Sequence, residues 1–184
     1  MTQKDLGALF ESLGVVQNGH FRRKSGRHAN RYVQCARLFE NAEATEQVCA
    51  LLAEHFEADR IDVVVSPAIG GVILGYEVGR QLQVRNIFPE RKEGALIFAR
   101  GFKLQKGERV LILEDEVTTG TSVRETIEIV HAMGGIVVGI GCVVDKSGGQ
   151  VAFDYPFFPL YTAKVDNYSK DKCPLCAAGY PLDN

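Results

Sequence analysis

The stretch Val110-Leu-Ile-Leu-Glu114-Asp115-Glu116-Val117-Thr118-Thr119-Gly120-Thr121-Ser122 decides the fold of this chain. Its first four residues, Val110–Leu113, are apolar and predict a buried strand. The residues after the loop, Thr121–Met133, carry apolar side chains at helical spacing and predict a helix. Ser122 and Glu125 have the spacing of a capping box at the start of that helix. We therefore expect a strand, a polar loop and a helix in direct succession.

The same alternation surrounds this stretch. Ile61–Val65 and Ile136–Val144 are short apolar runs rich in β-branched residues, and Val72–Leu82 reads as a helix between strands. Alternating strands and helices predict an α/β fold with a parallel sheet flanked by helices. Ligands bind such sheets beyond the carboxyl ends of the strands. Three loops should therefore form the site: Ser66–Gly71, Glu114–Thr121 and Asp145–Gly149.

Length and composition limit the classes of protein to consider. A chain of 184 residues with a formal net charge of −2 suits one domain, 1–184, with a small hood at 1–40 and a polar, turn-rich tail at 163–184 that ends in a mobile segment. Near neutrality argues against a dedicated nucleic-acid binder. We expect a cytoplasmic protein without a membrane partner, because no signal segment or long apolar run is present. Five scattered cysteines favour free thiols.

The loop after the first strand combines two chemical features. Glu114 and Asp115 stand at the carboxyl end of the strand, where neighbouring carboxylates repel one another unless a ligand neutralises them. Hydroxyl residues, Gly120 and a helix N-terminus follow, and together they form a seat for a phosphate group. An acidic pair beside such a seat suits the hydroxyls of a phosphorylated sugar or a hydrated Mg²⁺. A merely capped helix does not explain the two adjacent acids.

This stretch closely resembles the phosphoribosyl pyrophosphate (PRPP) motif of type I phosphoribosyltransferases. The resemblance implies a type I phosphoribosyltransferase-like sheet. It also implies that PRPP is bound by the residues of the motif: Glu114, Asp115, Glu116, Val117, Thr118, Thr119, Gly120, Thr121 and Ser122. Asp115 and Glu114 are then expected to be catalytic, together with Lys92. Glu116 departs from the family, which mostly has an apolar residue at that position.

A second resemblance concerns the amino-terminal segment. Phe21-Arg-Arg-Lys24-Ser25-Gly26-Arg27-His28 is similar to the hood of orotate phosphoribosyltransferases, and it holds a basic cluster that suits anionic substrates. The resemblance adds Lys24 to the residues that bind PRPP. For orotate it implies Thr118, Lys146, Tyr32 and Gln34. Lys146 stands where the family usually has an arginine, so the charge is kept but the bidentate fork is lost.

A third segment, Phe88-Pro-Glu-Arg91-Lys92-Glu93-Gly94, is similar to the mobile loop that closes over PRPP in this family. Arg91 and Lys92 match its start, and the rest follows the shorter variety of the loop. Arg100 or Lys103 is a candidate for the charge that the longer loop supplies. The loop Ser66–Gly71 resembles the pyrophosphate-binding loop, with Gly70 where some relatives have a lysine.

The resemblance covers nearly the whole chain and implies a reaction. PRPP and orotate give orotidine 5′-monophosphate and pyrophosphate, a step of de novo pyrimidine biosynthesis. Mg²⁺ is the implied cofactor, held mainly through PRPP and water, near Glu114 and Asp115. The implied assembly is a homodimer that shares loops between its sites.

Three alternatives stay open from the residues. The chain is a type I enzyme for another nucleobase, or a PRPP-binding regulator that has lost turnover. Cys173-x-x-Cys176 raises metal or redox chemistry, but one such pair is a weak zinc signal and favours a structural feature of the tail. The four histidines show no ligand spacing (His20, His28, His55 and His131), and His28 is a candidate for substrate contact.

Overall fold

The computed structural model describes residues 1–183 and contains a five-stranded parallel sheet in the order β4-β3-β7-β8-β9. Its strands in chain order are β3 (Val63–Val65), β4 (Arg85–Ile87), β7 (Arg109–Val117), β8 (Ile136–Asp145) and β9 (Phe157–Thr162). The predicted α/β class and the parallel sheet are confirmed.

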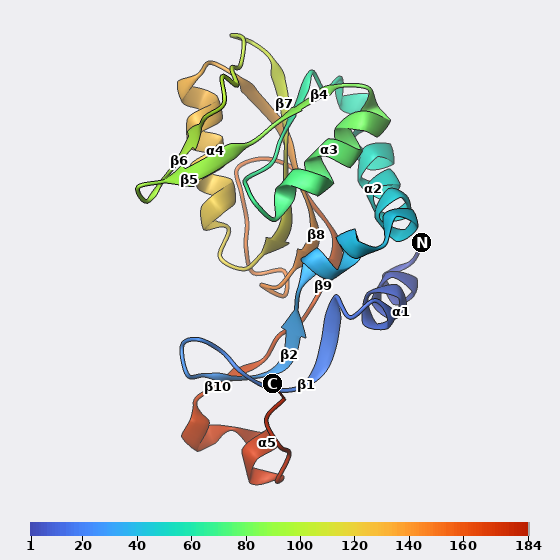
Figure 1. Cartoon of the computed structure of the whole chain (residues 1–184), viewed down its shortest axis with the longest axis vertical. Helices are drawn as coiled ribbons and strands as arrows, with labels where there is room; N and C mark the ends of the chain where they lie inside the picture. Colours follow the sequence, from blue (N-terminus) through green and yellow to red (C-terminus); the bar gives the residue numbers. More distant parts are fainter. Residues whose placement is uncertain (184) are drawn as a thin grey trace.

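Helices cover both faces of this sheet (Figure 1). On one face lie α2 (Ala42–Phe56) and α3 (Gly71–Leu82), and on the other lies α4 (Thr121–Ala132). Side chains alternate along a strand, so Leu111 and Leu113 of β7 join the core under α2 and α3, whereas Val110 and Ile112 join the core under α4. β7 is therefore buried on both sides, as its uninterrupted apolar run predicts.

The central strand is longer than its apolar run indicates. β7 continues past Leu113 to Val117, because β8 goes on pairing with it as far as Val117 opposite Asp145. On its other side the partner strand β3 ends at Val65, opposite Ile112. The acidic residues of β7 thus project beyond β3, and the space beside them is open to a loop.

The amino-terminal hood is a separate small sheet (Figure 1). It pairs β1 (Val16–Arg22), β2 (His28–Val33) and β10 (Asn167–Tyr168) in antiparallel fashion. The first helix α1 (Gln3–Ser12) precedes it, and the 3₁₀ segment η1 (Cys35–Glu40) leads from it to α2.

The carboxyl-terminal tail folds back onto this hood. It forms η3 (Lys170–Lys172) and the short helix α5 (Pro174–Ala177). Its end is docked on β1, since the Asp183 backbone N–H donates to the His20 carbonyl at 2.7 Å and the Asp183 carboxylate accepts from the His20 N–H at 2.7 Å. The end of the tail, which the sequence predicts to be mobile, is thus hydrogen-bonded to β1 through Asp183.

An exposed hairpin extends along α4 (Figure 1). It consists of β5 (Pro89–Lys92) and β6 (Ala95–Phe98). The remaining short element is the 3₁₀ turn η2 (Glu57–Asp59) after α2. Among residues 1–183, no helix has the length and apolar character needed to span a membrane.

Candidate active site

The acidic pair lies at the carboxyl edge of the sheet and is largely buried. Glu114 is only 7% exposed, and its carboxylate accepts the Asp115 backbone N–H at 3.3 Å. Burial, reinforced by the charge of Asp115, raises the pKa of Glu114 well above its usual range. Burial also raises the pKa of Asp115, with the neighbouring Glu116 adding repulsion. The pair therefore favours any ligand that brings positive charge or hydroxyl donors.

The third acid of the motif has partners of its own. Glu116 accepts the Cys35 backbone N–H at 2.7 Å and pairs with the Lys146 ammonium at 2.5 Å. The Glu116 and Lys146 side chains are 18% and 14% exposed, respectively. Glu116, which departs from the family pattern, thus joins η1, β7 and the loop after β8. Its charge is neutralised by Lys146, the residue that stands in place of the family's arginine.

The loop before α4, which the sequence predicts as a phosphate seat, surrounds a small hollow. Glu114 and residues 116–123 line a hollow of about 150 Å³. Gly120 is the N-cap of α4 with a φ of 75°, and it makes no side-chain capping bond. The predicted capping box of Ser122 and Glu125 is wrong, because the helix begins one residue after this left-handed glycine and Glu125 pairs with Arg91 instead. The first N–H groups of α4 are thus not taken by a side-chain cap, and their residues 121–123 line the hollow.

Arg124 is a residue that the sequence analysis missed. Its guanidinium donates to the Thr119 carbonyl at 2.7 Å and to the Ala152 carbonyl at 3.0 Å, and it lies 5.0 Å from the centre of the Phe153 ring. These contacts fix the loop Thr118–Gly120 in front of the helix. A Cβ on Gly120 would lie 2.9 Å from Phe153 and from Arg124, so this position needs glycine for space as well as for its backbone angle.

The loop Ser66–Gly71 fills the space beside the end of β7. Ser66 is fully buried, the peptide bond between Ala68 and Ile69 is cis, and Ile69 is 89% exposed. A Cβ on Gly70 would overlap the Asp115 carboxylate. Gly70 thus lets the loop pass directly over the Asp115 carboxylate, where a larger side chain would overlap it.

The hairpin β5–β6 carries Arg91 and Lys92. Arg91 pairs with Glu125 of α4 at 2.5 Å, and Lys92 is exposed. Neither residue is among the described residues that line the phosphate hollow. Arg100, the candidate substitute, makes two bonds to Glu90 at 2.8 and 2.9 Å, so its charge is already neutralised within the hairpin region.

A second cavity lies between the hood and the sheet edge. It measures about 520 Å³ and brings together the predicted residues Lys24, Tyr32 and Lys146 from distant parts of the chain. Its other lining residues are mostly basic or apolar and include Phe21, Arg22, Arg23, Ser25, Arg31, Val33 and Val165. Gln34 accepts a hydrogen bond from the Tyr32 hydroxyl at 2.9 Å, and Thr118 lines the phosphate hollow. Lys146 thus connects this cavity to the acidic edge through Glu116.

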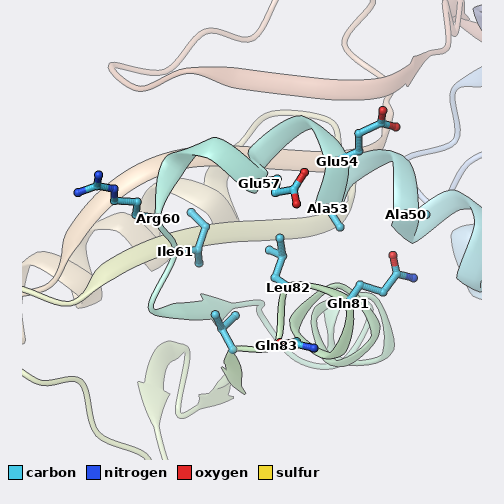
Figure 2. A pocket seen from close by; sticks show the side chains of 10 residues that line it. Ala50, Ala53, Glu54, Glu57, Arg60, Ile61, Gln81, Leu82 and Gln83 are labelled. Carbon is cyan, nitrogen blue, oxygen red and sulfur yellow. The ribbon is translucent and has the colours of Figure 1, made fainter.

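A cavity of about 620 Å³ lies elsewhere, between α2 and the segment that joins α3 to β4 (Figure 2). The side chains of Glu57, Ile61 and Leu82 point into it, whereas Arg60 points away. It is at the amino ends of β3 and β4, opposite to the edge that carries the acids, and its described lining contains none of the predicted site residues.

Comparisons with known proteins agree with this geometry. A phosphoribosyl transferase domain family matches residues 35–169. An orotate phosphoribosyltransferase of Caldanaerobacter subterraneus subsp. tengcongensis is 47% identical over 99% of the chain and 96% of that protein. One from Chlorobium phaeobacteroides is 44% identical over 100% and 95%. The crystal structure of orotate phosphoribosyltransferase from Aeropyrum pernix superposes with a TM-score of 0.72 at 24% identity, covering 86% of the chain and 94% of that structure.

Proposed function

The chain belongs to the phosphoribosyl transferase domain family and within it to the orotate phosphoribosyltransferases, and on this premise we propose that the edge formed by β7, the hood and α4 transfers the phosphoribosyl group of PRPP to orotate. The products are orotidine 5′-monophosphate and pyrophosphate. One observation carries the residue assignment: a phosphate-sized hollow, a buried acid pair and a basic cavity lie along the same edge of the sheet.

The 5′-phosphate belongs in the hollow at the start of α4. The N–H groups of the first helical turn and the hydroxyls of Thr118, Thr119 and Ser122 donate to it, and the helix dipole favours its charge. Arg124 keeps the loop in place from behind. The ribose then extends toward Glu114 and Asp115, whose carboxylates accept its hydroxyls.

Bond breaking at the anomeric carbon needs charge stabilisation and positioning more than a covalent nucleophile. The orotate nitrogen attacks as the diphosphate leaves, and positive charge develops on the sugar ring. Asp115 is assigned to stabilise that charge, while Glu114 holds the ribose hydroxyls beside it. The diphosphate lies against the backbone of Ser66–Gly71. To bind it, Arg91 breaks its ion pair with Glu125 and Lys92 turns in from solvent.

The acid pair fits the magnesium ion that the family uses. Mg²⁺ takes oxygen ligands, commonly one or two carboxylates with waters and substrate phosphates, and Glu114 and Asp115 offer two neighbouring carboxylates whose pKa values are raised by burial. When bound with PRPP, the metal ion would neutralise the leaving diphosphate.

Orotate recognition is assigned to the hood cavity. Its carboxylate needs a cation, which Lys146 or Lys24 supplies, and the exposed ring of Tyr32 offers a face for the pyrimidine. Lys146 is held 2.5 Å from Glu116, so orotate shares this lysine with an internal carboxylate. We also propose, from the family, a single domain over 1–184 that works in the cytoplasm as a homodimer with shared loops.

The test is an assay of orotate consumption with PRPP and Mg²⁺, with uracil, adenine and guanine as parallel substrates. We expect turnover of orotate and release of one pyrophosphate per orotidine 5′-monophosphate. Binding of PRPP without pyrophosphate release would instead indicate a regulator. Turnover of another base in place of orotate would overturn the assignment of the hood cavity.

A further inference from the structure

Four potential metal ligands meet where the tail joins the hood. The two histidines belong to the hairpin, His20 to β1 and His28 to β2. Cys173 immediately precedes α5, and Cys176 lies within it. One ligand atom from each lies within 4.8 Å of all the others. His20, His28 and Cys173 are at most 3% exposed, and no named step of the proposed reaction uses any of the four.

The hairpin explains a grouping that sequence spacing does not show. Arg22 pairs with His28 across β1 and β2, and His20 lies two residues before Arg22, where the pairing is irregular between Asn18 and Phe21; its ring contacts that of His28. Two histidines eight positions apart thus become diagonal neighbours in the sheet. His20 and His28, which show no ligand spacing in the sequence, are thus brought to the cysteine pair, and His28 belongs to this cluster and is not among the described residues that line the hood cavity.

The distances match a tetrahedral zinc site. With Zn–S near ~2.3 Å and Zn–N near ~2.05 Å, tetrahedral angles place sulfur and nitrogen ligands about 3.5 Å apart. The Cys173 and Cys176 sulfurs lie 3.4 and 3.6 Å from the His20 Nε2, and the Cys176 sulfur lies 3.3 Å from the His28 Nδ1. The two nitrogens are 2.8 Å apart, about half an ångström closer than tetrahedral geometry requires. A small rotation of one ring accommodates the ion.

Hydrogen bonding alone accounts for this arrangement poorly. The His20 Nδ1 lies 2.9 Å from the Tyr180 carbonyl, which can only accept, so Nδ1 carries the proton and Nε2 presents a lone pair. That one lone pair faces the His28 Nδ1 and both sulfurs. Several ligand atoms that converge on one point, with a carbonyl orienting the histidine from behind, are the arrangement found around bound metals.

The docked tail provides the outer contacts, since Asp183 bonds to both backbone groups of His20.

We propose that His20, His28, Cys173 and Cys176 bind one Zn²⁺ and fasten the carboxyl-terminal tail to the amino-terminal hairpin. Four protein ligands close the coordination shell, so the site is structural and takes no substrate. The hairpin that it fastens also carries Arg23 and Lys24, which line the hood cavity. The zinc site thus stabilises the hairpin that carries these two cavity residues.

The first test is the metal content of the wild-type protein. Untagged protein, purified in reducing buffer and passed through dilute EDTA, is analysed by plasma mass spectrometry, and we expect about one zinc per chain. Replacement by cobalt should yield the intense visible bands of a tetrahedral ion and a thiolate charge-transfer band. Metal below about a tenth of an equivalent, or a Cys173–Cys176 disulfide in its place, overturns the proposal.

Variants distinguish these ligands from other thiols. Cys176 is exposed, so Cys176→Ala removes a ligand with little effect on packing, and Cys49→Ala removes a thiol from the core under α2 as the matched control. We expect Cys176→Ala to lose at least about tenfold in zinc affinity and to increase hydrogen exchange in residues 170–183 and in β1–β2. Cys49→Ala should retain the metal, and Cys176→His should recover it. Full zinc in Cys176→Ala contradicts the assignment.

Discussion

Replacing Lys146 by methionine would leave the Glu116 carboxylate without its cation in a site where both side chains are less than a fifth exposed. Glu116 would keep only its bond from the Cys35 N–H. A hydrogen bond to a charged group contributes about 1.5–3 kcal/mol, so we expect Lys146→Met to lower the free energy of unfolding by about 2 kcal/mol. With an unfolding entropy of roughly 2.1 cal/mol/K per residue, 184 residues give about 0.4 kcal/mol/K. The melting temperature should fall by about 5 °C.

A double variant separates the stability of this pair from its role with orotate. Lys146→Met combined with Glu116→Gln removes the stranded charge, and we expect it to recover at least half of the lost melting temperature in calorimetry. The KM for orotate, measured by loss of its absorbance, should stay raised in both variants because the cation for the substrate carboxylate is missing. Two results refute the reasoning: a melting temperature for Lys146→Met within about 1 °C of wild type, or a normal orotate KM in the double variant.

Three further predictions follow from the acid pair and its neighbouring loop. Asp115→Asn should lower kcat/KM by about one to three orders of magnitude while the circular dichroism spectrum stays unchanged, and near-normal turnover would rule out its role. The raised pKa of Glu114, about 9, means that the folded chain binds more protons than the unfolded one, so stability should fall as pH rises from about 5 to 8.5. Thermal melts should show this slope and its reduction in Glu114→Gln; an unchanged slope contradicts the shift. Gly70→Ala places a methyl group against Asp115 and should weaken PRPP binding in calorimetry by about tenfold, whereas unchanged affinity would show that the loop yields.

The sequence patterns predicted the parallel sheet and its covering helices because the burial of these elements determines where apolar residues occur. All four side chains of Val110–Leu113 are apolar and buried, although they point to alternate faces of the sheet. Such a run is typical of a central parallel strand that is covered by helices on both faces. The position of the acid pair follows from the same run, since the residue after the last apolar position must lie at the carboxyl edge.

Contacts between distant segments account for what the patterns missed. The capping box failed because Gly120, with its left-handed φ, is the N-cap of the helix in place of Ser122, which leaves Glu125 free to pair with Arg91 of the hairpin. The pairing of Glu116 with Lys146 depends on the register of β7 against β8, which places Val117 opposite Asp145. The spacing of residues along the sequence specifies neither the position of the hairpin against α4 nor the register of β7 against β8.

The hood makes the strongest case for a metal ion from its packing alone. Only the base of the hairpin reaches the main core, through Val16 of β1 and Val33 of β2. Toward its far end the described buried side chains are Ala29, His20, His28 and Cys173, which together form very little apolar core. A two-stranded hairpin is at best marginally stable, and β10 adds only two residues to it. Since small units with little apolar core commonly depend on disulfides or metals, and all five cysteines are free, a zinc ion bound by these side chains supplies the stability that the hairpin lacks.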